Sequence, residues 1–146
     1  MHQSMRKLLP LGAAALLAFS TAAAAKDVTL SGSFAGENGA TNQPSGHVDA
    51  TLNTETHQLK YTIDYSGLTG PVTIAHFHGP AKPGVAAGVL TLIPGPYKTG
   101  MSATVTINSA TQSAMLSGMT YVNLHTTAHP KGEARAQMTV GQSNGM

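Results

Sequence analysis

The chain has 146 residues, no cysteine, 10% charged residues and a formal net charge of +2. The absence of cysteine excludes disulfides and thiolate-based metal sites. Removing Arg6 and Lys7 from the eight basic residues leaves six, against six acidic residues. The rest of the chain therefore lacks the clustered positive charge that nucleic-acid binding requires.

The first 25 residues have the pattern of a cleavable secretory signal peptide. Arg6 and Lys7 precede an uncharged apolar run at residues 8–19, and the small residues at 20–25 fit an A-x-A cleavage rule. The alternative, a membrane anchor, requires roughly 20 apolar residues, which is more than this run supplies. We therefore expect a periplasmic or secreted protein whose mature chain does not span a membrane.

The remainder indicates one all-β domain, residues 27–140, followed by a polar tail, residues 141–146. Short segments rich in Val, Ile, Thr and Tyr alternate apolar with polar residues, and Gly, Pro, Asn and Ser separate them. The expected strands lie, in chain order, near residues 28–34, 48–52, 59–65, 72–78, 88–93, 102–107, 113–116, 121–125 and 133–140. No segment shows a sustained 3.6-residue apolar repeat. The pattern predicts an antiparallel Greek-key β-sandwich of about eight or nine strands.

His76 and His78 form an H-x-H pair in the strand expected at residues 72–78. Residues i and i+2 of a strand share a face, so the two imidazoles are close enough to chelate one metal ion. The pair also continues the parity of Val72 and Ile74, which predicts that the two histidines end a row of buried side chains.

Two further histidines are candidate ligands. His125 ends the strand expected at residues 121–125, and His129 follows in the next loop. Three imidazoles with an open coordination position suit copper or zinc. The alternative is that the histidines are structural and hydrogen-bond loop carbonyls, and the sequence does not decide between the two. His47 and His57 are expected to face solvent.

Other polar and sulfur-containing residues have two interpretations each. Met101, Met115, Met119 and Met138 are either thioether ligands for Cu(I) or, as methionine more commonly is, core filling. Glu133 and Arg135 share a strand face, and charge-assisted hydrogen bonds to loops are favoured over a catalytic pair. The chain contains none of the usual hydrolase, metalloprotease, nucleotide-binding or dinucleotide-binding motifs, so an enzymatic function has little support.

Three blocks of the sequence together resemble the CHRD domain, which is named for its occurrence in chordin. They are Ala75-His76-Phe77-His78-Gly79-Pro80, Gly118-x-x-Tyr121-Val122-Asn123-Leu124-His125-Thr126 and Pro130-x-Gly132-Glu133-x-Arg135-x-Gln137. The resemblance implies an extracellular module, although the bacterial members have no agreed biochemical activity. The antagonism of bone morphogenetic proteins that is associated with chordin does not transfer to a chain with a bacterial type of leader.

A weaker similarity is to Cu/Zn superoxide dismutases. It matches His76 and His78 to an H-x-H of that family, His125 to a later copper ligand and Arg135 to its active-site guanidinium. The bridging histidine, the zinc-site aspartate and the paired cysteines have no counterpart, so dismutation is not expected.

We therefore expect an exported CHRD-domain protein that binds a transition metal, with copper favoured, through His76, His78, His125 and His129. The alternative is a non-catalytic interaction module in which the histidines are structural and an exposed sheet or loop recognises an unknown protein partner or a glycan.

Overall fold

The computed structural model describes residues 15–18 and 26–141. The expected signal peptide, residues 1–25, and the tail beyond residue 141 therefore lie outside the described residues, except for the short stretch 15–18. Within the described ranges no helix is long and apolar enough to cross a membrane.

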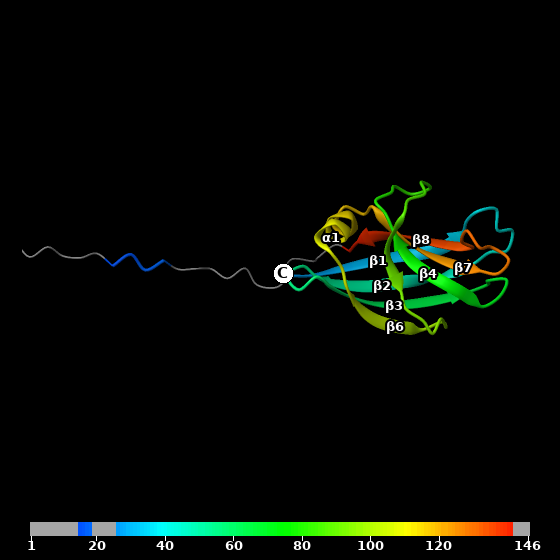
Figure 1. Ribbon diagram of the computed structural model, residues 1–146, viewed down its shortest axis with the longest axis horizontal. Helices are drawn as coiled ribbons and strands as arrows, with labels where there is room; N and C mark the ends of the chain where they lie inside the picture. The colour runs from blue at the N-terminus through cyan, green and yellow to red at the C-terminus, as the bar shows by residue number, and fades with distance from the viewer. Residues whose placement is uncertain (1–14, 19–25, 142–146) are drawn as a thin grey trace, which may run out of the picture.

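The described chain forms eight strands and one short helix (Figure 1). In chain order these are β1 (Asp27–Gly36), β2 (Ser45–Asn53), β3 (Gln58–Ser66), β4 (Val72–His78), β5 (Val89–Ile93), β6 (Met101–Thr106), α1 (Ser109–Leu116), β7 (Thr120–Thr126) and β8 (Ala134–Val140). The strands form one sheet of order β5-β4-β7-β8-β1-β2-β3-β6, in which every pair is antiparallel. The sheet curls over, so the predicted antiparallel sandwich is confirmed.

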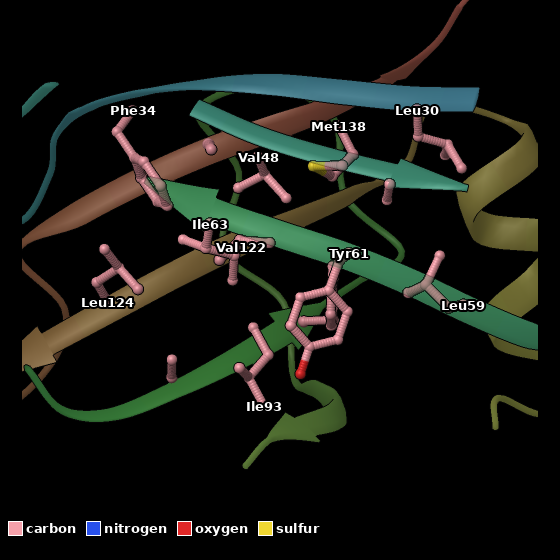
Figure 2. Packing of buried hydrophobic residues seen from close by; sticks show 14 of the residues in the cluster. Leu30, Phe34, Val48, Leu59, Tyr61, Ile63, Ile93, Val122, Leu124 and Met138 are labelled. Atoms are coloured by element: carbon pink, nitrogen blue, oxygen red, sulfur yellow. The ribbon is translucent and has the colours of Figure 1, made fainter. Parts of the chain in front are cut away.

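The core lies between the two halves of the curled sheet. Side chains from β1, β2 and β3 meet side chains from β5, β7 and β8, as Figure 2 shows for Leu30, Val48, Ile63, Ile93, Val122, Leu124 and Met138. All seven are at most 2% exposed. Met101, Met115 and Met138 belong to this core, so core filling is confirmed for these three methionines.

The prediction of a strand at residues 113–116 is wrong, because this segment belongs to α1. The Asn108 side chain caps the helix by accepting a hydrogen bond from the Thr111 N–H at 2.8 Å. Gly118 follows the last turn at φ +69°, a backbone conformation that glycine adopts without strain. Only Thr111, Ala114 and Met115 of the helix are buried, so the apolar repeat is too short to recognise from its period.

The predicted orientation of the H-x-H pair is also wrong. A register irregularity falls between Val72 and Ile74, and it shifts the side-chain parity of β4. Val72 is buried whereas Ile74 is 37% exposed, and Ala75 and Phe77 point into the core instead. His76 and His78 therefore lie on the outer face of the sheet.

Candidate metal centre

Three histidines from two neighbouring strands converge on the outer face of the sheet. His76 and His78 come from β4 and His125 comes from β7, which pairs with β4. One ring nitrogen from each lies within 4.8 Å of those of the other two. The ring of His76 is 5.4 Å from each of the other two rings, centroid to centroid. His125 follows His76 by 49 residues and His78 by 47 residues in the sequence, and the pairing of β4 with β7 brings these three predicted ligands together.

Two of the three rings are oriented by backbone carbonyls. His78 Nδ1–H donates to the Ala87 carbonyl at 2.9 Å, and His125 Nδ1–H donates to the Pro130 carbonyl at 2.8 Å. This tautomer leaves the Nε2 lone pair of each ring free, as in many metal-binding histidines. Stacking on Tyr121, with centroids 4.9 Å apart, further restrains the ring of His78.

One nitrogen of each ring is buried and without a partner among the described residues. These atoms are His76 Nδ1, His78 Nε2 and His125 Nε2. A tetrahedral ion about 2.05 Å from each ligand separates ligand nitrogens by roughly 3.4 Å, so the ring nitrogens that lie within 4.8 Å of one another need to close by at most about 1.4 Å. Small side-chain rotations are sufficient for such a movement.

The surroundings keep two of the imidazoles neutral. Burial lowers the pKa of His76, and the neighbouring His78 and His125 lower it further. Burial also lowers the pKa of His78, against the opposing effect of its hydrogen bond to the Ala87 carbonyl. Neutral imidazole is the form that binds metal, so no proton has to be displaced from these two rings near neutral pH.

The loop of residues 79–88, between β4 and β5, is held against the outer face of the sheet beside this site. Arg135 donates to the carbonyls of Val85 at 2.7 Å and Lys82 at 3.1 Å, and its guanidinium lies 3.5 Å from the centre of the Tyr121 ring. The Tyr121 hydroxyl accepts from the N–H of Ala87, whose carbonyl holds His78. The predicted charge-assisted bonds from Arg135 to a loop are thereby confirmed.

Glu133 directly precedes β8 and is fully buried, at the end of the β7–β8 pair where His125 lies. Its carboxylate accepts hydrogen bonds from the Asn42 side chain at 2.6 Å, from the Thr69 N–H and hydroxyl at 2.7 Å each, and from the Thr126 hydroxyl. Burial favours the protonated form, but these bonds outweigh it and lower the pKa of Glu133 to about 2. Glu133 therefore ties three segments together, and the predicted structural role is confirmed.

Asn123 is a site residue that the sequence reasoning missed. It is 3% exposed and lies directly opposite His76 in the β4–β7 register. Its side-chain amide donates to the Glu37 carboxylate. Asn123 precedes His125 by two residues, and this i, i+2 spacing was the signal that could have placed both side chains on one face.

The remaining histidines lie apart from the trio. His129 is half-buried in the turn after β7, where its N–H donates to the Thr126 carbonyl, and it is not one of the three converging residues. His47 is exposed, as predicted, beside Asp49 and Asp64. His57 is half-buried rather than solvent-facing, because its Nδ1 bonds the Gln112 side chain of α1 at 2.9 Å.

Comparison with known proteins assigns the family. The family model for the CHRD domain matches residues 27–138 of the sequence. No curated protein and no solved structure matches the chain significantly. The match covers about three quarters of the chain, including the three histidines, Arg135 and Glu133, and its bounds agree with those of the sheet. The chain belongs to the CHRD domain family.

Proposed function

We propose that this protein is exported and binds one transition-metal ion, with copper favoured over zinc, through His76, His78 and His125. The observation that carries the proposal is the convergence of three ring nitrogens within 4.8 Å, together with a buried, unpartnered nitrogen on each of the three described rings. Buried polar atoms without partners are uncommon in folded proteins, and a metal ion satisfies all three at once.

The ligand set supports copper. All three donors are imidazoles, no thiolate is available in the chain, and divalent copper binds nitrogen ligands more strongly than zinc does. Three protein ligands leave a coordination position open, which suits an ion that is stored or passed on. His129 remains an accessory candidate, since the proposed site is formed without it.

The cellular setting of the proposal comes from the sequence pattern and the family. The leader of residues 1–25 supports a periplasmic or secreted protein, and CHRD domains occur in extracellular proteins. Storage, delivery or tolerance of a metal outside the cytoplasm would fit a chain that carries no enzymatic motif.

Titration of the purified protein with Cu(I), Cu(II) and Zn(II), against chelators of known affinity, tests the proposal. The wild type should bind one ion, and the double variant His76→Ala/His78→Ala should bind at least about 100-fold more weakly, because it loses two of three ligands. The matched control is His47→Ala, which removes an exposed histidine of β2 and should leave binding unchanged. Equally weak binding by the wild type and the double variant would refute the proposal.

A second candidate function is that of a non-catalytic interaction module. Val85, Val89 and Leu92 are each more than half exposed, on or beside the edge strand β5 and close to the histidines. If the histidines only hold the fold together, the double variant should melt at a lower temperature in metal-free buffer and a partner should be captured from an envelope extract. An unchanged melting temperature would count against this candidate.

A further inference from the structure

Asn123 belongs to β7, the strand that supplies His125 to the histidine cluster. It points to the outer face of β7 between Tyr121 and His125, and its direct cross-strand neighbour is His76. His78 and His125 belong to the rows on either side of the His76–Asn123 row, yet their ring nitrogens come within 4.8 Å of one another. The two rings therefore lean toward this row. Asn123 itself is only 3% exposed, although it is a polar side chain on an outer face.

The Asn123 amide is oriented by the carboxylate of Glu37. Its Nδ2 donates to Glu37 Oε1, so the amide oxygen points elsewhere. That oxygen, Oδ1, is buried and has no hydrogen-bond partner among residues 15–18 and 26–141. A Cβ on Gly132 would collide with both Asn123 Nδ2 and Glu37 Oε1, so glycine at φ +115° leaves the space that the pair occupies. The chain thus provides room for an arrangement that leaves a carbonyl oxygen unsatisfied.

Leaving a buried carbonyl oxygen without a partner costs about 1–3 kcal/mol, so such an atom calls for an explanation. Glu37 accepts one N–H of the Asn123 amide, and Oδ1 is the atom of this amide that is buried without a partner. Asn123 lies opposite His76 in the β4–β7 register, so an unpartnered carbonyl oxygen and three unpartnered imidazole nitrogens belong to side chains on one face of these two strands. A cation suits such a set, because it binds acceptor atoms and requires no hydrogen-bond donor.

We infer that Asn123 Oδ1 is the fourth protein ligand of the metal centre and that it makes the site prefer divalent ions over Cu(I). This inference rests on the proposed function, since it names a further ligand of the same site. Cu(II) and Zn(II) take four or more ligands and accept oxygen donors, whereas Cu(I) prefers soft donors and is satisfied by few of them. Glu37 acts as a positioning residue that holds the amide with its oxygen toward the ion.

The test compares Asn123→Ala with the wild type in separate titrations with Cu(II), Zn(II) and, under a reductant, Cu(I). Loss of the oxygen should weaken Cu(II) and Zn(II) binding about 10- to 100-fold and weaken Cu(I) binding less than about threefold. The Cu(II)/Cu(I) reduction potential should then rise by about 59 mV for each tenfold change in the ratio of the two affinities. Electron paramagnetic resonance of the Cu(II) forms should show a changed ligand set.

Two further variants separate ligation from folding. The double variant Asn123→Asp/Glu37→Gln keeps an oxygen donor at position 123 and keeps the hydrogen bond with donor and acceptor exchanged, so it should retain the preference for divalent ions. His47→Ala changes an exposed residue of β2 that is not a proposed ligand, so it should retain the wild-type affinity ratio. Circular dichroism and melting temperature establish that each variant is folded.

The outcomes distinguish this inference from the proposed function. A wild type that binds metal, with an affinity ratio and Cu(II) spectrum unchanged in Asn123→Ala, overturns the fourth ligand and leaves the histidine site intact. Equal weakening of all three ions assigns Asn123 a structural role and also overturns the inference. A wild type that binds none of the ions overturns both.

Discussion

Replacing Glu133 by glutamine should remove most of the acid sensitivity that this residue confers on the fold. The carboxylate is fully buried, and each of its oxygens accepts two hydrogen bonds. Glutamine has the same shape but is neutral and offers one acceptor oxygen, so the Thr69 and Thr126 hydroxyls lose the charged oxygen to which they donate when the amide nitrogen takes its place. The substitution therefore leaves buried donors without partners, which is among the more costly single changes in a core.

The magnitude follows from the pKa of Glu133, which these hydrogen bonds lower from 4.5 to about 2 despite burial. One pKa unit is worth about 1.4 kcal/mol, so ionised Glu133 contributes about 3 kcal/mol to the free energy of unfolding. Because the pKa is lowered in the folded state, the unfolded chain binds more protons between the two values. This contribution is therefore complete above about pH 5 and is lost as the pH falls toward 2.

Urea unfolding of the wild type and Glu133→Gln at a series of pH values measures this contribution. At neutral pH the variant should be less stable by about 3 kcal/mol, and the difference should shrink as the pH falls from about 5 to 2. Glu55→Gln, at an exposed position in the turn between β2 and β3, should track the wild type throughout. A stability difference that stays constant over the whole pH range would refute the reasoning.

Three other changes test the structure around the site. Arg135→Met removes the hydrogen bonds to the 79–88 loop, so amide exchange in that loop should speed up while exchange in β2 stays unchanged. The pKa values of His76 and His78 are lowered in the folded state, so the unfolded chain binds more protons just below pH 6.5. Urea unfolding should therefore show that the stability of the wild type falls from about pH 7 to 5. The stability of the double variant His76→Ala/His78→Ala should fall less over this range. Gly46→Ala, at φ +128° against the β3 backbone, should lower the melting temperature by several degrees in calorimetry.

The core strands could be predicted from the sequence because their alternation has a direct physical cause. Apolar residues at every second position must share one face of a pleated strand, which located the inward-facing residues of β2 and β3 to the residue. Helix α1 was missed because eight residues with three buried side chains do not produce a measurable 3.6-residue period. Its end signals, Asn108 and Gly118, were present and more informative than the period.

The candidate site was predicted in part. His76, His78 and His125 were identified by residue type and position on strands, and they do converge. Their orientation was predicted incorrectly, since an irregularity in pairing between Val72 and Ile74 leaves no clear mark on an alternating pattern. The signal-peptide prediction stays a prediction, because residues 1–14 and 19–25 lie outside the described part of the chain.

By itself, the sequence determined most of the strand pattern, the family and the identity of the candidate histidine ligands, since these depend on residues close in the chain or on motifs read in order. Only the tertiary structure decided that β4 pairs with β7, that the histidines lie outside the core, and that Asn123 and Glu37 meet beside Gly132. The reason is physical. Strand pairing and register are set by packing between segments far apart in the chain, and a shift of one residue moves a side chain to the opposite face.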